Sequence, residues 1–363
     1  MAKQAAAVLA PISTEGYSWE TLHDLVGIAL RAKISVLMRG HPGVGKSTLA
    51  HRLAQDLGLE LIDIRLAQRD PADLAGVYFP DAERKRLELV PPAWALRARE
   101  VPCLVFLDEI NAAVTRLHQA AAYQIVLERR VGPVEFHKDT RILAAGNLEE
   151  DNAIVSSLSS ALCNRFAHFI LKVNAEDWLR WATNERLHPD ILSFISAHKE
   201  DALYKNTGDV AFPSPRSWEM ASRVYELATE ADQKRMVTSC VGSEAAEKFS
   251  SYLTIYRKID AEKIVRKGAA IDFSIAGKSE ASFRHAAVYA VGYWIYRTDN
   301  LEDAVLPNVV KFLRSKGLDP EYQFIFLRFL HSHDPRFLVR MRAVPEYRQL
   351  CTELVNFRTA GLN

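Results

Sequence analysis

The sequence is poor in cysteine, has no long apolar run and carries almost no net charge. Its four cysteines, Cys103, Cys163, Cys240 and Cys351, lie far apart and form no CxxC pair. A disulfide framework or a cysteine-ligated metal site is therefore not expected. No stretch approaches the length of a membrane span. These absences predict a protein of the cytoplasm with reduced thiols.

The charge balance excludes a general electrostatic attraction to polyanions. There are 46 Lys and Arg residues against 45 Asp and Glu, a formal net charge of +1. Binding to nucleic acid or to an anionic membrane is therefore not expected, although a local basic patch could still exist. The first fourteen residues, MAKQAAAVLAPIST, have one lysine and a short alanine-rich stretch. We interpret them as a flexible lead-in and not as a signal peptide.

The 363 residues are enough for two or three domains, and their patterning changes halfway. Up to about residue 173, apolar runs typical of buried strands alternate with segments of helical spacing, which predicts a parallel sheet covered on both faces. From about residue 174 helical periodicity takes over, in the segments 175–200, 217–237 and 243–259. The sequence thus predicts an α/β domain followed by a similar number of helical residues.

A phosphate-binding loop is predicted between the first apolar run and the helix that follows it. GHPGVGKS fits GxxxxGK[ST], in which glycines let backbone amides turn toward phosphate oxygens. Lys46 would reach the β- and γ-phosphates, and Ser47 would hold Mg²⁺. The candidate nucleotide-binding residues of this loop are Gly40, His41, Pro42, Gly43, Val44, Gly45, Lys46, Ser47 and Thr48. The alternative is a glycine-rich turn without a ligand.

Two adjacent acids follow the strongly apolar segment 101–107. Ligands bind at the carboxyl ends of strands in such sheets, so we expect Asp108 to hold Mg²⁺, through water, and Glu109 to act as the general base for the attacking water. A solvated strand end is the alternative, and the preceding phosphate loop makes it the weaker one.

Three further polar residues are candidates for the same chemistry. Asn147 ends another apolar run and would orient the water beside the γ-phosphate. Arg165 precedes a strand and would reach the nucleotide of a neighbouring subunit as an arginine finger. Arg216 lies in the first turn of a helix, where it opposes the helix dipole, so we predict that it binds the γ-phosphate. The alternatives are a plain turn asparagine at 147, an ordinary surface salt-bridge arginine at 165 and a solvated charge at 216.

In this order, the motifs resemble those of AAA+ ATPases of the MoxR group. GHPGVGKS is similar to the Walker A motif, LVFLDEIN to Walker B, AAGN to sensor 1, NRF to the arginine-finger box and PSPRSW to sensor 2. Residues 68–98 resemble the insert that this group carries in helix 2, and residues 127–147 resemble the hairpin before sensor 1. The resemblance implies a P-loop NTPase αβα core of AAA+ type with both hairpins (residues 1–173), an all-α lid (174–259) and a C-terminal helical extension (260–363).

The resemblance also implies function. It implies Mg²⁺-dependent ATP hydrolysis at the subunit boundaries of a hexameric ring, coupled to chaperone-like remodelling of a protein partner, often one with a von Willebrand factor A domain. Arg84, Lys85 and Arg86 at the tip of the first hairpin would contact an acidic partner, or simply form a solvated turn. The residues leave open whether ATP or GTP is used.

Alternatives to this function come from different classes. One is a nucleic-acid motor or restriction-type NTPase, against which the near-neutral charge speaks. Another is a nucleotide-dependent scaffold that hydrolyses slowly. A metal site at His331, His333 and Asp334 is disfavoured, because no third cluster at suitable spacing joins these residues.

Overall fold

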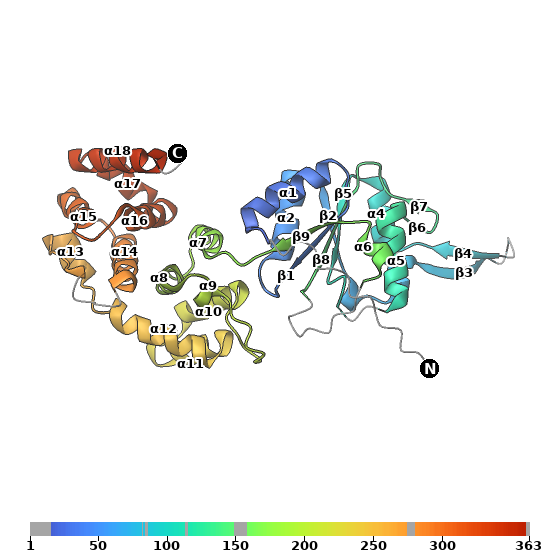
Figure 1. The fold of residues 1–363 in the computed structure, drawn as a ribbon, viewed down its shortest axis with the longest axis horizontal. Coiled ribbons are helices and arrows are strands. Elements are labelled where there is room, and N and C mark those ends of the chain that lie inside the picture. Colours follow the sequence, from blue (N-terminus) through green and yellow to red (C-terminus); the bar gives the residue numbers. More distant parts are fainter. Residues whose placement is uncertain are drawn as a thin grey trace. The chain divides into compact units, whose positions relative to one another are not determined.

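The structure is a computed structural model that describes residues 16–81, 83, 86–112, 115–148, 158–273 and 280–360. The chain forms two compact units, one up to Val173 and one from Asn174 onward. In Figure 1 the first runs from blue to green and the second from green to red. The predicted lead-in, residues 1–14, lies outside the described residues.

A five-stranded parallel sheet forms the centre of the first unit. Its strands follow the order β2-β5-β8-β1-β9. They are β2 (Glu60–Arg65), β5 (Cys103–Asp108), β8 (Arg141–Gly146), β1 (Val36–Gly40) and β9 (Ala167–Leu171). Every residue of β5 is buried, as expected for a strand covered on both faces. The predicted fold class, a P-loop NTPase core of AAA+ type followed by helices, is confirmed.

Helices cover both faces of this sheet because successive side chains of a strand point to opposite sides. Leu37, Val105 and Ile142 belong to a buried cluster with residues of α4 (Ala93–Glu100) and α5 (Arg116–Glu128). The opposite face is covered by α1 (Trp19–Arg31) and α2 (Lys46–Asp56) (Figure 1). The shorter elements of the unit are η1 (Leu66–Gln68), α3 (Pro71–Ala75) and α6 (Ser160–Cys163).

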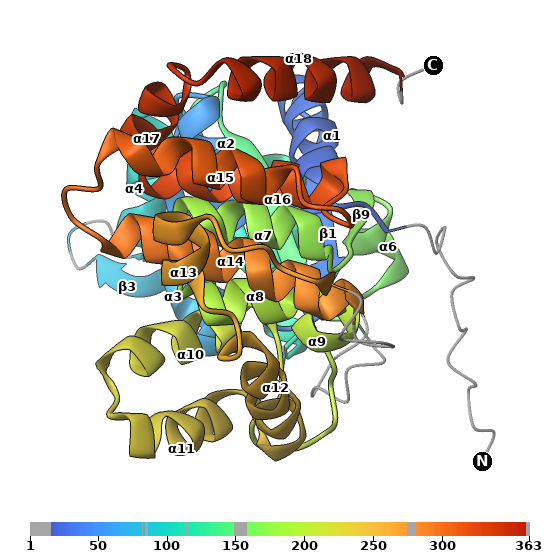
Figure 2. The same ribbon diagram turned by 90° about the vertical axis from the view of Figure 1, so that its left-hand side faces the viewer.

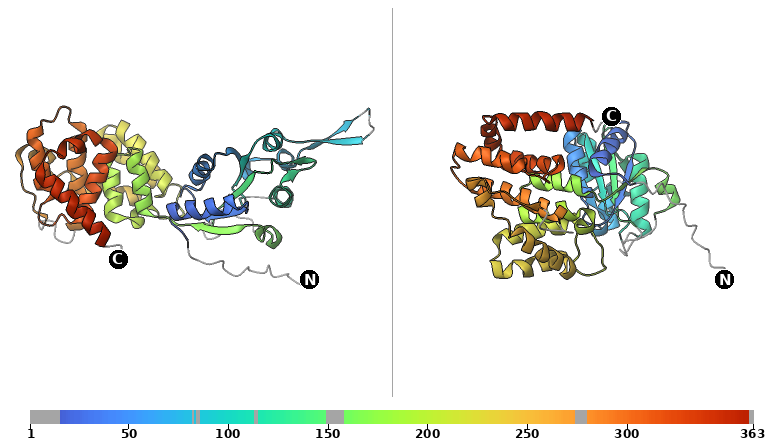
Figure 3. Two further views of the ribbon diagram at one scale, coloured as in Figure 1. Left: turned by 90° about the horizontal axis from the view of Figure 1, so that it is seen from above. Right: turned by 60° about the vertical axis from the view of Figure 1, so that its left-hand side comes forward.

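Two antiparallel hairpins are added to the sheet. The first pairs β3 (Val77–Asp81) with β4 (Arg86–Val90), and the second pairs β6 (Arg130–Val131) with β7 (Val134–Glu135). The β3–β4 hairpin extends away from the sheet (Figure 3, left). Its apolar side chains are largely exposed: Tyr78 by 64%, Phe79 by 56% and Leu87 by 65%. Of the basic tip predicted there, Arg84 and Lys85 lie outside the described residues, and Arg86 begins β4.

The second unit contains only helices among its described residues. In chain order they are α7 (Ala175–Asn184), α8 (Pro189–His198), α9 (Glu200–Leu203), α10 (Pro215–Leu227), α11 (Glu230–Val241), α12 (Ser243–Tyr256), α13 (Ala261–Lys267), α14 (Glu280–Arg297), η4 (Asp303–Val305), α15 (Leu306–Leu313), α16 (Pro320–His333), α17 (Pro335–Met341) and α18 (Pro345–Ala360).

Helix α14 forms the centre of this unit. It contacts α8, α12, α13 and α16 (Figure 2), and its residues 285–292 are all buried. A helix that is buried on every side needs no polar face, which explains its run of alanine, valine and aromatic residues. The continuous helical pattern predicted for 175–200 is divided in the structure, because Pro189 begins a new helix. None of the helices in the described ranges has the combined length and apolar character needed to cross a bilayer.

Candidate functional site: a phosphate-binding loop at the carboxyl edge of the sheet

The sheet brings three predicted site segments to one edge. Strands β5, β8 and β1 are neighbours and run parallel, so their carboxyl ends lie side by side. Asp108 ends β5, Asn147 follows β8, and the glycine-rich loop follows β1 at Gly40. Residues that are far apart in the sequence therefore meet at a single place.

The glycine-rich loop has the backbone shape that its sequence predicts. Gly43 has φ of 76° and Gly45 has φ of 96°, values in the left-handed region that only glycine adopts at no cost. Gly45 is also the N-cap of α2, and it has no side chain to cap the first amide groups of that helix. Such a helix start offers free N–H groups and a partial positive charge to an anion.

Lys46, the first residue of α2, is held over this loop. Its ammonium group donates to the carbonyl oxygens of Gly40 (2.7 Å) and His41 (2.8 Å) and to Oδ1 of Asn147 (2.9 Å). The contact between Lys46 and Asn147 joins the predicted Walker A and sensor 1 residues. The ammonium group is thus positioned by the loop backbone on one side and by the neighbouring strand on the other.

Ser47 and Asp108 form a pair of oxygen ligands suited to Mg²⁺. The hydroxyl group of Ser47 donates to Oδ2 of Asp108 at 2.9 Å, and Oδ1 of Asp108 accepts the backbone N–H of Glu109 at 2.9 Å. Burial, and then the Asp108 carboxylate, raise the pKa of Asp63 on β2, whose Oδ1 is buried without a partner among the described residues. This concentration of oxygen atoms and negative charge fits a hard divalent cation.

Glu109 stands in an unusual backbone conformation next to this pair. Its φ is 56°, a left-handed value that costs a residue with a side chain on the order of 1–3 kcal/mol. The following amide, that of Ile110, donates to the carbonyl oxygen of Ala145 at 2.9 Å. The half-buried Glu109 is thereby placed at the turn directly after β5, beside the end of β8.

Asn111 is a site residue to which the sequence analysis assigned no role. The residue is 6% exposed. Its side-chain amide forms two hydrogen bonds with the backbone of Asn147: Nδ2 donates to the carbonyl oxygen at 2.9 Å, and Oδ1 accepts the N–H at 3.1 Å. The available signal was its position, two residues after the acid pair in LDEIN.

Arg165 lies far from the phosphate loop of its own chain. It is exposed and precedes β9 by two residues. The first amide of that strand, at Ala167, donates to the carbonyl oxygen of Ser35, just before β1. Arg165 is therefore at the amino edge of the sheet, about 16 Å, the length of a five-residue strand, from the edge that holds Gly40.

Arg216 belongs to the helical unit. It is exposed in the first turn of α10, between Pro215 and the buried Ser217. The hydroxyl group of Ser214 accepts the N–H of Ser217 and caps the helix. Arg216 thus starts a well-capped helix with its side chain free of the core, and its role at the nucleotide stays a prediction.

His333, from the disfavoured metal site, is bonded and packed within its own helix. Nδ1 of His333 bonds to the carbonyl oxygen of Phe329 at 3.0 Å, and its ring stacks on that of Phe329.

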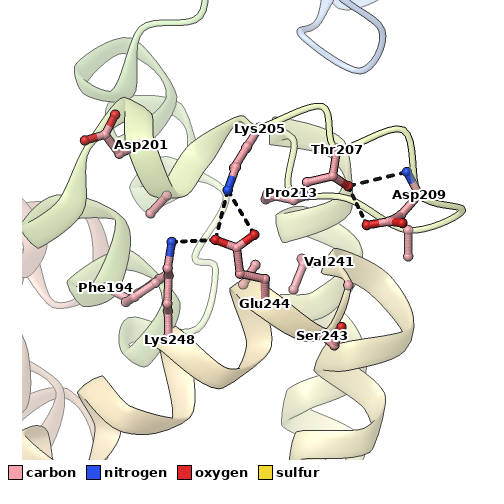
Figure 4. Close-up of a pocket in the computed structure, with 14 residues that line it drawn as sticks. Phe194, Asp201, Lys205, Thr207, Asp209, Pro213, Val241, Ser243, Glu244 and Lys248 are labelled. Carbon is pink, nitrogen blue, oxygen red and sulfur yellow. Dashed lines mark hydrogen bonds and ion pairs between the residues drawn. The ribbon is translucent and has the colours of Figure 1, made fainter.

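A cavity of about 50 Å³ in the helical unit is lined by residues of the 205–213 loop and of α12 (Figure 4). Glu244 lies there between the ammonium groups of Lys205 and Lys248, each at 2.9 Å, and these lysines lower its pKa to about 2. The cavity is far too small for a nucleotide.

Comparison with known proteins supports the nucleotide-binding character of the first unit. Residues 36–173 match the sequence model of the ATPase family associated with various cellular activities (AAA). The chain is 30% identical over 137 residues to ATPase family gene 2 protein homolog B of Bos taurus and 35% identical over 96 residues to nuclear valosin-containing protein-like of Mus musculus. These alignments span 37% and 26% of this chain but only 17% and 10% of the relatives.

Among solved structures, the chain resembles the RuvB Holliday junction branch migration motor of Thermotoga maritima. The two are 19% identical, with 72% of this chain and 80% of that chain covered and a TM-score of 0.36. A TM-score this low supports no conclusion about the function of this chain. The family match covers β1, β5, β8 and β9 with their site residues. Residues 36–173 of this chain therefore form an ATPase domain of the AAA type.

Proposed function

We propose that this chain is a MoxR-type AAA+ ATPase, which hydrolyses Mg²⁺-ATP in a ring of six subunits and uses the cycle to remodel a partner protein. The observation that carries the proposal is the meeting of Lys46, the Ser47–Asp108 pair and Asn147 at one edge of the sheet. The presence of the β3–β4 and β6–β7 hairpins within an AAA-type domain supports the MoxR assignment.

Nucleotide binding is the task of the loop after β1. The amide groups at the start of α2 and the ammonium group of Lys46 would neutralise the phosphate oxygens. Because the ammonium group already has three oxygen acceptors, phosphate oxygens would replace acceptors that the loop and Asn147 provide. Ser47 and Asp108 would hold Mg²⁺, which when bound neutralises charge on the phosphates.

Hydrolysis needs a base and a group that orients the attacking water. Glu109, fixed at the turn after β5, is the proposed general base, and Asn147 is the proposed orienting group. Arg165 is the proposed finger for the nucleotide of the next subunit, supported by its exposed position at the opposite edge of the sheet. Arg216 is proposed to contact the γ-phosphate from the helical unit.

The partner is proposed to be a protein with a von Willebrand factor A domain, encoded beside this chain. The exposed β3–β4 hairpin is the proposed contact, because its apolar side chains are open to solvent. The cytoplasm is the proposed compartment, in keeping with four cysteines that are all free thiols.

The variant Glu109→Gln tests the proposal most directly. It keeps the size and polarity of the side chain but removes its basicity, so the ATP dissociation constant should stay within about threefold of the wild type while turnover falls roughly 10²- to 10⁴-fold. Binding is measured with a fluorescent ATP analogue, and turnover is measured by phosphate release with and without the proposed partner protein. The mass of the ring is measured by sedimentation in the presence of ATP.

Glu100→Gln, on the exposed end of α4, serves as the matched control and should hydrolyse ATP at the wild-type rate. Wild-type turnover in Glu109→Gln would refute the base assignment. A wild-type protein that stays monomeric and cleaves neither ATP nor GTP, with or without the proposed partner protein, would refute the proposed function.

A further inference from the structure

The segment that carries Glu109 is joined to the segment that carries Asn147 by a short ladder of hydrogen bonds. The first rung is the bond from the amide of Ile110 to the carbonyl oxygen of Ala145. The second is the pair of bonds between the Asn111 side chain and the backbone of Asn147. A primary amide offers a donor and an acceptor side by side, so Asn111 pairs with a peptide group as a strand would.

Gly146 provides the room that this pairing requires. A Cβ atom at position 146 would lie 2.6 Å from Oδ1 of Asn111, too close for a real contact, and 3.0 Å from its Cγ, tighter than most real contacts. The φ of Gly146 is not in the left-handed region, so glycine is needed there for space and not for backbone freedom. The Asn111 amide and Gly146 therefore form one fitted contact.

The ladder reaches the predicted reacting groups on both sides. Asn147, whose backbone the amide holds, accepts a hydrogen bond from Nζ of Lys46 at 2.9 Å through its own side chain. Glu109, two residues before Asn111, has a left-handed φ of 56°, a conformation that persists only when its surroundings enforce it. A contact that joins residue 111 to residue 147 thus fixes the spacing between base and orienting group.

We propose that Asn111 is a positioning residue for hydrolysis, which holds Asn147 and Glu109 in register through its two hydrogen bonds to the Asn147 backbone. The inference rests on the proposed function of the same site. Asn111 acts through Asn147 and Glu109, since both of its hydrogen bonds go to the backbone of Asn147. Its loss should therefore lower kcat and leave nucleotide affinity nearly unchanged.

The test is a double-mutant cycle between Asn111 and Asn147. Asn111→Ala alone should lower kcat about 10- to 100-fold, the usual cost of losing a supporting contact, with the dissociation constant of the ATP analogue within about threefold of the wild type. In an Asn147→Ala background the backbone bonds of Asn111 remain and only its effect on Glu109 is left. The same change should therefore lower kcat by a factor at least about threefold smaller than in the wild type, because residues that act as a unit are not additive.

A purely structural role would give a different result, namely the same fold-loss in both backgrounds, and this would overturn the inference. Asn111→Asp keeps the shape and the acceptor for the Asn147 N–H but replaces the donor, so it should fold and still lose at least about tenfold in kcat. Thr140→Val is the matched control, since Thr140 is a fully buried polar residue just before β8. It should lower the unfolding midpoint without changing kcat.

The outcomes also separate this inference from the proposed function. Wild-type kcat in Asn111→Ala, together with the expected loss in Glu109→Gln, would overturn the positioning role and leave the ATPase proposal standing. Absence of nucleotide hydrolysis in the wild-type protein would overturn both.

Discussion

The two units of this chain bury polar side chains in different settings. In the α/β unit, the buried Asp108 and Asn111 lie at the carboxyl edge of the sheet, next to the glycine-rich loop. In the helical unit, buried polar side chains bond to one another or to the backbone of the packed helices, as Ser193 does with Tyr252 at 2.5 Å and Ser196 with His285 at 2.8 Å. Polar groups at the edge of a sheet remain able to meet a ligand, whereas those between packed helices are enclosed by protein.

The comparison teaches how burial should be interpreted in this protein. Burial of a polar group in the helical unit indicates a contribution to stability, since an unpaired group there would cost about 1–3 kcal/mol. Burial at the carboxyl edge in the α/β unit is what we expect of groups that preorganise the proposed chemistry. Substitutions at that edge should therefore affect rate with little effect on stability, and those in the core of the helical unit should do the reverse.

The largest expected effect is that of Arg165→Ala in the α/β unit. An arginine finger contributes roughly 10³- to 10⁵-fold to the rate, so hydrolysis should nearly vanish. Arg165 is exposed, so the free energy of unfolding should change by no more than about 0.5 kcal/mol. Phosphate release and urea unfolding measure the two quantities.

Mixed rings test whether Arg165 acts across a boundary. Subunits with Arg165→Ala combined with subunits with Lys46→Ala should regain part of the activity, because some boundaries then pair an intact loop with an intact finger. No recovery in rings shown by mass spectrometry to contain both subunits would argue against action in trans.

Next in size is the effect of Trp218→Ala in the helical unit. The Trp218 ring is fully buried against Phe194 and Phe249, and its Nε1 donates to the carbonyl oxygen of Ala202 at 2.9 Å. Its removal should lower the free energy of unfolding by about 3–5 kcal/mol, measured by urea denaturation. Leu227→Ala, at a position that is 88% exposed, is the control. A Trp218→Ala protein that keeps its stability but has lost ATP hydrolysis would contradict the claim that core substitutions in the helical unit affect stability and not rate.

The smallest expected effect is a pH dependence from His285. Burial, followed by the charges of Lys199 and His198, lowers the pKa of His285 to about 4, against about 6.5 in an unfolded chain. The unfolded state therefore binds the proton first, so stability is full above about pH 6.5 and falls as the pH drops toward about 4, by at most about 3 kcal/mol.

His285→Gln should make this decline shallower while keeping a polar partner for Ser196. Urea unfolding of both proteins at about pH 7 and about pH 4.5, on either side of the ordinary histidine pKa, measures the difference. An equal loss of stability on acidification in the two proteins would show that His285 does not contribute.

The fold and the place of several candidate site residues could be predicted from the sequence because both leave spacing patterns. Alternating apolar runs and helical segments indicated the parallel sheet, and GxxxxGK[ST] located Lys46 and Ser47. Apolar strands that end in polar residues located Asp108 and Asn147, which the structure brings to within one hydrogen bond of Ser47 and Lys46.

The remainder depends on contacts that leave no such pattern. Asn111 bonds to the backbone of Asn147, and a backbone partner has no identity that the sequence could reveal. The left-handed φ of Glu109 accompanies the hydrogen bond from the next amide, that of Ile110, to Ala145 and does not follow from the preference of a glutamate. The finger role of Arg165 and the nucleotide contact of Arg216 involve other subunits or another unit, so they remain predictions.

The β3–β4 hairpin has a practical consequence for anyone who handles the purified protein. A two-stranded ribbon that exposes Tyr78, Phe79 and Leu87 to water has unpaired strand edges and apolar faces. These features promote strand addition between molecules. The protein should scatter light increasingly as it is concentrated, and charged substitutions on the ribbon should delay precipitation while the sheet behind it stays intact.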